Sequence, residues 1–157
     1  MGKFVCEPPP TLTASDYMNI FDEVIKLKLP IGKYVVVGSG ILIALNLKEG
    51  NDVDIVVTKD IFEEHMKNGW EQIPWTYLDH SNGIFLRKGL VELYLDVNCG
   101  KFNPSTSELI QRAKIINGIA FTNLSDTLNF KKEYAKNNPK HIKDIKLLEE
   151  YILNSVI

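Results

Sequence analysis

The chain has 157 residues, of which 45% are hydrophobic and 24% charged, and its net charge is −2. These values are typical of one globular domain. They exclude a disordered chain and a protein that binds nucleic acid through overall positive charge alone. No apolar run approaches the ~20 residues of a membrane-spanning helix, and no signal-peptide block is seen, so we expect a cytoplasmic protein without a membrane partner. Two cysteines, Cys6 and Cys99, are too few for a disulfide scaffold or a cysteine-ligated zinc site.

The first third of the chain is predicted to alternate helices and strands. A capping-box pattern at 13–16 precedes apolar residues at helical spacing, and β-branched runs that end at glycine predict buried strands. The predicted elements are a helix at 17–27, a strand at 34–37, a helix at 41–47, a strand at 53–57 and a helix that Asp60 caps and that ends near Gly69.

The middle of the chain is predicted to be antiparallel, because Asn-Gly and Lys-Gly pairs between apolar runs are hairpin signals. A strand at 70–78 is interrupted by Pro74, and 81–83 forms the turn after it. Strands at 84–87 and 90–97 then form a hairpin around Lys88-Gly89.

The last third is predicted to be mainly helical. The predicted elements are a helix at 107–115, a turn at Asn117-Gly118, an extended piece at 119–121, a helix capped by Ser125 or Asp126 that runs to about Lys136, and a helix at 140–153 with Ile142, Ile145, Leu148 and Ile152 on one face. We therefore expect one α/β domain, a small mixed β-sheet flanked by helices, with a core at about 31–100 and a C-terminal helical part at about 105–157.

Two carboxylates carry the first chemical signal. Side chains alternate along a strand, so Asp52 and Asp54 point to one face while Val53 and Ile55 point into the core. Two carboxylates on one face repel each other unless a positive group lies between them. A divalent cation with a preference for oxygen ligands, such as Mg²⁺, suits this position.

A phosphate-binding signal lies close by. Gly38 and Ser39 follow a predicted buried strand and precede a predicted helix. Glycine allows close approach of the backbone to a phosphate, and the serine hydroxyl can donate to a phosphate oxygen. The amides at the start of the following helix would point at the same place.

Gly38-Ser39, a twelve-residue spacer and Asp52-Val53-Asp54-Ile55 together resemble the signature of the DNA polymerase β-like nucleotidyltransferase superfamily. The resemblance is closest to the small stand-alone members, which include minimal forms and the AbiEii-type toxins, and it covers about residues 34–151. It implies a nucleotidyltransferase-like fold. It also implies transfer of a nucleoside monophosphate from an NTP to a hydroxyl acceptor, with Mg²⁺ or Mn²⁺ as cofactor and pyrophosphate as the second product.

The resemblance further implies a third carboxylate on a neighbouring strand, which would complete the metal site and orient or deprotonate the acceptor. Glu92 and Asp96 are the candidates, because alternation along the predicted strand 90–97 puts both on one face with Tyr94. Glu92 follows the hairpin where the family usually has its aspartate, and Asp96 has the usual residue type. Both stay open, so the predicted catalytic and metal-binding residues are Asp52, Asp54, Glu92 and Asp96.

The C-terminal third is also similar to the family, whose members have a helical lysine followed by an Arg-Pro-Lys-Asp-like segment and a later aspartate. Pro139, Lys140 and Asp144 match this pattern, whereas Asn138 and His141 stand in place of the arginine and the first acid. The resemblance implies that lysines here neutralise the triphosphate. The predicted nucleotide- and phosphate-binding residues are Gly38, Ser39, Lys131 and Lys140.

Structural interpretations compete with each of these signals. A dinucleotide-binding turn would need a third glycine where Ile43 stands. The lysine-rich segment 131–146 is also the pattern of a solvated helix face. No histidine has a partner at ligand spacing, so we predict surface positions for His65, His80 and His141. Aromatic residues that could stack on a base are instead predicted to pack in the core, namely Trp70, Trp75 and Tyr77.

The leading hypothesis is a small Mg²⁺-dependent nucleotidyltransferase with an NTP as one substrate. The acceptor stays open between tRNA or another RNA, a protein and a small molecule, and a homodimer or a partner protein could complete the site. The second hypothesis is a non-catalytic nucleotide- or partner-binding module of the same fold, such as one component of a toxin–antitoxin pair. A third is a nucleic-acid adaptor that uses the lysine-rich helices.

Overall fold

The computed structural model describes residues 20–75, 83–98 and 100–155. The predicted cap at 13–16, both cysteines, Tyr77, His80 and most of the turn at 81–83 lie outside these ranges.

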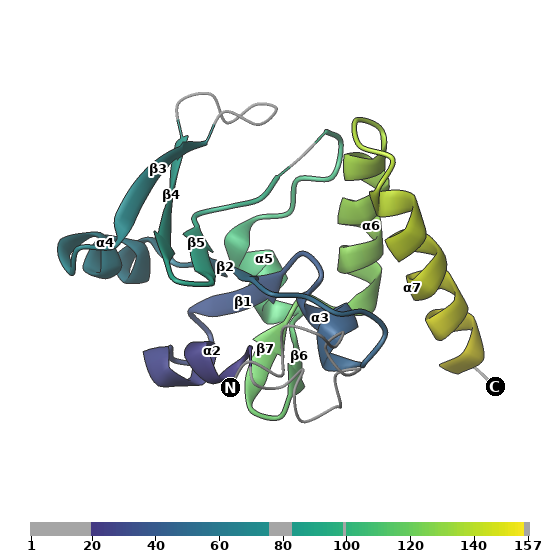
Figure 1. Cartoon of the computed structure of the whole chain (residues 1–157), viewed down its shortest axis with the longest axis horizontal. Coiled ribbons are helices and arrows are strands. Elements are labelled where there is room, and N and C mark those ends of the chain that lie inside the picture. Colours follow the sequence, from purple (N-terminus) through teal and green to yellow (C-terminus); the bar gives the residue numbers. More distant parts are fainter. Residues whose placement is uncertain (1–19, 76–82, 99, 156–157) are drawn as a thin grey trace, which may run out of the picture.

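A mixed sheet forms the centre of the described residues (Figure 1). Strand β1 pairs antiparallel with β2 and parallel with β7, and β2 pairs parallel with β5. The seven strands are β1 (Tyr34–Val37), β2 (Val53–Val57), β3 (Glu71–Trp75), β4 (Gly83–Lys88), β5 (Val91–Tyr94), β6 (Lys114–Ile116) and β7 (Ile119–Phe121), in the spatial order β3-β4-β5-β2-β1-β7-β6. The predicted mixed sheet is therefore confirmed.

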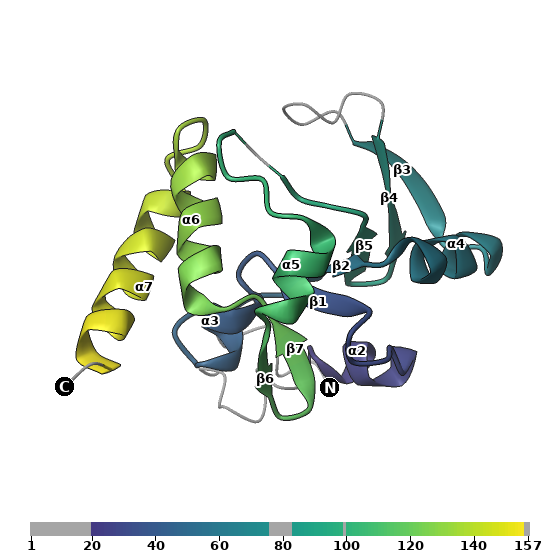
Figure 2. The same cartoon turned by 180° about the vertical axis from the view of Figure 1, so that it is seen from behind.

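Helices cover both faces of the sheet and form the C-terminal part of the fold. Helices α6 and α7 pack against each other as an antiparallel pair at the end of the molecule opposite α4 and the β3–β4 hairpin, as both views show (Figures 1 and 2). The helices are α2 (Asp22–Leu27), α3 (Gly40–Ala44), α4 (Lys59–Lys67), α5 (Thr106–Gln111), α6 (Leu124–Ala135) and α7 (His141–Ser155). None of those in the described ranges is long and apolar enough to cross a membrane.

Strand alternation divides the core into two clusters. On one face, Val36 and Ile55 pack with residues of α2, α3 and α4, and Phe21 meets Phe121 edge to face with ring centroids 5.2 Å apart. On the other face, Val35 and Val56 pack with residues of α5 and α6. Because β1 and β2 are central strands, both of their faces are covered, and their near-continuous apolar runs follow from that position.

Several predicted elements in the first half have different ends. The first helix begins at Asp22 rather than including residues 20–21, and α3 spans Gly40–Ala44 rather than 41–47. Helix α4 has Thr58 at its N-cap, with Asp60 in its first turn. Strand β3 continues through Pro74, which is tolerated because β3 is at the edge of the sheet.

The hairpin strands and the C-terminal elements also differ from prediction. Strand β5 ends at Tyr94, so the prediction that the strand continues through residues 95–97 is wrong. Residues 114–116 form β6 rather than the end of a helix, because Asn117 and Gly118 adopt positive φ (50° and 81°) and reverse the chain so that β6 pairs with β7. The last helix spans His141–Ser155, and Ile142 is 47% exposed rather than on a buried face with Leu148.

Close packing explains the glycine at position 40, which follows the predicted phosphate turn and begins α3. A Cβ on Gly40 would lie 2.4 Å from Cγ1 of Val36 and 3.4 Å from Cδ1 of Phe121. The start of α3 is therefore in direct contact with β1 and β7, and this contact positions Ser39 at the end of β1. Gly38 has a φ of +67°, a conformation that glycine adopts without steric cost.

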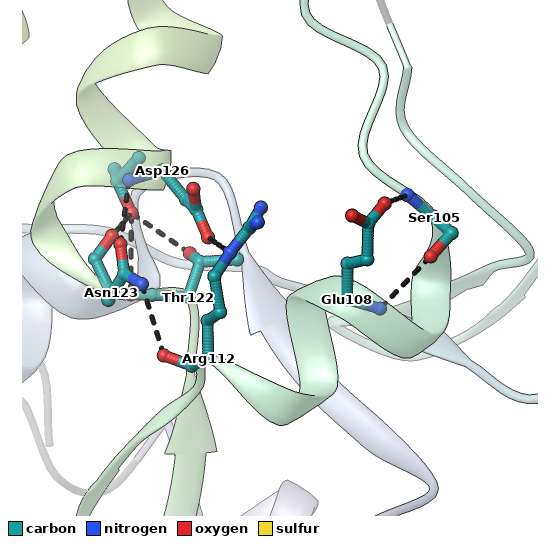
Figure 3. Close-up of polar contacts among 7 residues, drawn as sticks. Ser105, Glu108, Arg112, Thr122, Asn123 and Asp126 are labelled. Carbon is teal, nitrogen blue, oxygen red and sulfur yellow. Dashed lines mark hydrogen bonds and ion pairs between the residues drawn. The ribbon is translucent and has the colours of Figure 1, made fainter.

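The start of α6 is held by a polar network between α5 and α6 (Figure 3). The N-cap of α6 is Asn123, not Ser125 or Asp126: its side-chain oxygen accepts from the amide of Asp126 at 2.7 Å, and its Nδ2 donates to the carbonyl of Arg112 at 3.1 Å. Nε of Arg112 pairs with Asp126 at 3.0 Å. At the other end of α5, Ser105 and Glu108 form a capping box.

Replacing Asn123 by alanine is expected to lower the free energy of unfolding by about 1–2 kcal/mol, because the helix loses its cap and its hydrogen bond to Arg112. Urea unfolding measures this loss. Asn123→Ser is the matched control, since serine keeps a capping oxygen but cannot reach the Arg112 carbonyl in the same way. An Asn123→Ala protein as stable as wild type would contradict the assigned cap.

Candidate functional site

A cavity of about 940 Å³ lies between the sheet and the α6–α7 pair, in the size range of small-molecule sites. Its walls are the turn after β1, the loop between α3 and β2, the start of β2, one face of α6 and the first turns of α7. Six residues predicted for the site line it, namely Gly38, Ser39, Asp52, Asp54, Lys131 and Lys140. Residues far apart in the chain thus meet at one surface, although their predicted roles stay predictions.

Asp54 is the most perturbed carboxyl group of the cavity. Its register opposite Val37 in β1 brings it beside the glycine turn, with Oδ2 3.5 Å from the position of a Cβ on Gly38. Its Oδ1 is buried and has no hydrogen-bond partner among the described residues. Burial raises the pKa of Asp54 to about 7, and the negative charges of Glu92 and Asp52 add to the effect.

Asp52 directly precedes β2 and lines the same cavity as Asp54, in agreement with the predicted common face. It is an exposed residue, whereas Asp54 is half-buried. The pair therefore offers one exposed and one half-buried carboxylate to a ligand in the cavity.

The parallel pairing of β2 and β5 distinguishes the two candidate third carboxylates. Glu92 is the register partner of Asp54 on β5. Its carboxylate accepts from Tyr94 Oη at 2.6 Å and from Arg87 Nε at 3.1 Å. Asp96 lies beyond the end of β5 and accepts from the backbone amide of Asn98 at 3.2 Å. Because Asp96 lies outside the strand, the alternation that was expected to place it on one face with Glu92 does not apply to it. Neither Glu92 nor Asp96 is among the described residues that line the cavity.

A buried ionic cluster connects Ser39 with the helices. Asp144 Oδ2 pairs with Lys131 Nζ at 3.0 Å and with Lys48 Nζ at 2.8 Å, and both lysines donate to Ser39 Oγ, at 2.9 and 3.2 Å respectively. The side chains of Lys131 and Asp144 are 5% and 4% exposed. The interpretation of segment 131–146 as a uniformly solvated face is therefore wrong for these two residues.

Charge and burial oppose each other in this cluster. Burial lowers the pKa of the Lys131 ammonium, and its pairing with Asp144 opposes that change. Burial alone would raise the pKa of Asp144, but hydrogen bonds from Lys48 and Lys131 lower it below its ordinary value. Two ammonium groups around one carboxylate leave an excess positive charge beside Ser39, which favours an anionic ligand.

Lys48 is a residue of the cavity that sequence reasoning missed. It lies in the loop between α3 and β2, within the spacer between Gly38-Ser39 and Asp52, and its side chain is 37% exposed. Asp144 matches the C-terminal pattern of the family, but that pattern does not predict that it pairs with Lys131. The spacing of Lys131 and Asp144 across two helices carries no local sequence signal, so only packing of α6 against α7 reveals the pair.

The histidine and tryptophan predictions have mixed outcomes. His65 is 6% exposed, its Nδ1 lies 2.8 Å from the Ile61 carbonyl and its ring meets Trp70 edge to face, so the predicted surface position is wrong. The core position predicted for Trp70 is confirmed. Trp75 packs edge to face against Tyr94, and both residues also line the cavity. His141 is half-buried in the cavity wall.

The donor set can be compared with the needs of a metal ion. Within the described ranges, no three His, Cys, Asp or Glu side chains form a ready-made metal cage. Mg²⁺ does not require one, because proteins usually bind it through one or two carboxylates together with waters and substrate phosphates. Asp52 and Asp54, with the unpartnered Oδ1 of Asp54 beside an anion-attracting cluster, fit that mode of binding.

Comparisons with known proteins add no relationship to this geometry. No family model, curated protein or solved structure matched the chain.

Proposed function

We propose that the protein is a Mg²⁺-dependent nucleotidyltransferase that moves a nucleoside monophosphate from an NTP to a hydroxyl acceptor and releases pyrophosphate. The proposal is supported chiefly by one observation: Asp54, whose Oδ1 has no hydrogen-bond partner among the described residues, and Ser39, whose hydroxyl accepts from Lys131, line the same cavity. A metal-nucleotide complex carries both charges that this surface would accept, a cation for the carboxylates and phosphates for the lysines.

In this proposal, acidic side chains of the cavity bind the metal ion, and basic side chains bind the phosphates of the same metal-nucleotide complex. Asp52 and Asp54 would hold the metal ion. Ser39, Lys131 and Lys140 would bind the phosphates, and Lys48 is added to this set because it shares Ser39 Oγ with Lys131. When bound, Mg²⁺ would neutralise charge on the phosphates.

The reaction transfers the α-phosphorus between two oxygens. The acceptor oxygen forms a bond to the α-phosphorus, the bond to the bridging oxygen of the β-phosphate breaks, and pyrophosphate leaves with that electron pair. The hydroxyl proton passes to a carboxylate base. Glu92 is favoured over Asp96 for this role because it is the register partner of Asp54. Positioning and charge neutralisation would provide most of the rate enhancement.

Calorimetric titration with each of the four NTPs, in Mg²⁺ and then in EDTA, tests the proposal. We expect binding that requires Mg²⁺ and, with α-labelled NTP and RNA, protein or small-molecule acceptors, label transfer together with pyrophosphate release. Mg²⁺-dependent binding without transfer to any acceptor class would favour a non-catalytic nucleotide-binding module. Absence of NTP binding in either condition would contradict both functions.

A further inference from the structure

His141 is a half-buried side chain that the proposed reaction does not use. It is the first residue of α7 and lines the cavity together with Lys140 and Lys131. Its Nδ1 is buried and has no hydrogen-bond partner among the described residues. Buried polar atoms in folded proteins are nearly always hydrogen-bonded, so an unpaired nitrogen in a cavity wall indicates a partner that the described residues do not supply.

The surroundings of His141 oppose a positive charge on its ring. Lys131 of α6, Lys140 just before α7 and Lys48 of the α3–β2 loop all act against the imidazolium, and Asp144 acts for it. The ring also packs 5.5 Å, centroid to centroid, from Tyr134 of α6. Burial is the largest of the effects that disfavour the imidazolium. Together they lower the pKa of His141 to about 4, so its ring is neutral at pH 7 in the free protein.

We propose that His141 binds a phosphate oxygen of the nucleotide or pyrophosphate and takes up a proton as this anion enters the cavity. The inference rests on the phosphate-binding part of the proposed function and extends it to a position where this chain departs from the family pattern. A polyphosphate would offset the charges of the three lysines, which are the groups that disfavour the imidazolium. It would also supply an acceptor for a ring N–H, and both effects favour the protonated ring.

The sign of the pH dependence follows from this coupling. If the anion raises the pKa of His141, the complex binds more protons than the free protein between the two pKa values. Polyphosphate affinity should therefore increase as the pH falls from 8 toward 6. Asp54 lines the same cavity and has a pKa of about 7, so its protonation changes polyphosphate affinity in the same direction, and the variant of His141 described below separates the two contributions.

Nuclear magnetic resonance of the histidine rings, with inorganic pyrophosphate as the probe and EDTA present, tests the inference on the full chain. We expect the His141 titration midpoint to rise by about three pH units at saturating pyrophosphate, to near 7, which is the shift that a tenfold change of affinity at pH 6 requires. His65 is the internal control, because it is buried on the other side of the sheet and its Nδ1 lies 2.8 Å from a backbone carbonyl. The resonances of its ring should not respond to pyrophosphate.

His141→Asn is the matched variant, because the asparagine amide occupies roughly the place of Nδ1 and keeps a neutral donor but cannot gain a charge. It should identify the His141 resonance and bind pyrophosphate about tenfold more weakly than wild type at pH 6, with a smaller difference at pH 8. An unchanged His141 midpoint at saturating pyrophosphate would overturn the inference while leaving the proposed function standing. Failure of pyrophosphate to bind would also overturn it. A His141 response without any NTP transfer would instead contradict the catalytic proposal alone.

Discussion

Replacing Asp54 by asparagine is expected to abolish Mg²⁺-dependent NTP binding and to reduce nucleotidyl transfer by about 100-fold or more. The amide keeps the shape of the side chain but removes the charge that a cation would require. Asp54 Oδ1 has no hydrogen-bond partner among the described residues, so no described hydrogen bond depends on that oxygen. Calorimetry with NTP and Mg²⁺ measures the first effect, and labelled NTP measures the second.

The same variant is expected to be more stable than wild type at high pH. The pKa of Asp54 is about 7 in the folded protein, above its ordinary value of 3.8, so the folded state holds the proton more tightly than the unfolded state. Stability from this group is fully present below pH 3.8 and is lost as the pH rises through 7. Urea unfolding in EDTA at pH 5 and pH 8 should show that wild type loses about 2 kcal/mol more than Asp54→Asn over this interval.

Asp60→Asn is the control for this experiment. Asp60 is an exposed acid in the first turn of α4, away from the cavity, and its pKa is lowered to about 2 chiefly by a hydrogen bond from Lys33. Its replacement should leave NTP binding unchanged and should not make the protein more stable at pH 8. An Asp54→Asn protein that still binds NTP in Mg²⁺ would contradict the assigned metal site.

Replacing Asp144 by asparagine is expected to lower the free energy of unfolding by about 3–5 kcal/mol at pH 7. The change leaves the Lys131 ammonium buried beside a second ammonium, that of Lys48, with no carboxylate between them. Lys48→Ala is the matched control, because its side chain is 37% exposed and its loss should cost about 1 kcal/mol or less. Urea unfolding of the two variants at the same pH measures the difference.

Two further observations separate the electrostatic cause from simple loss of packing. Without Asp144 the pKa of Lys131 should fall further below its ordinary value, so part of the lost stability should return as the pH rises from 7 to 9.5. The double variant Lys131→Met/Asp144→Leu replaces both charges with apolar groups and should be more stable than Asp144→Asn, yet bind NTP weakly. Wild-type stability of Asp144→Asn would contradict the buried ion pair.

The elements predicted well from sequence are those whose signals are local. The strands at 34–37 and 53–57 are continuous β-branched runs, and the shared cavity wall of Asp52 and Asp54 follows from side-chain alternation over three residues. The errors occur where a pairing strand or a capping residue determines the type or the ends of an element. Residues 114–116 form a strand because β7 pairs with them, and Asp60 loses the cap to Thr58, the residue just before the first turn of α4.

The sequence by itself determined an α/β fold with a mixed sheet, the Gly38-Ser39 turn after a buried strand and the acidic pair at the start of β2, because alternation and glycine turns act within a few residues. Only the tertiary structure decided that Glu92 is the register partner of Asp54, that β5 ends before Asp96, and that Lys48 joins Lys131 and Asp144 around Ser39. These relations join residues distant in the chain, such as Ser39 and Asp144, which are 105 positions apart. Strand pairing and helix packing produce such contacts, and neither leaves a periodic pattern along the chain.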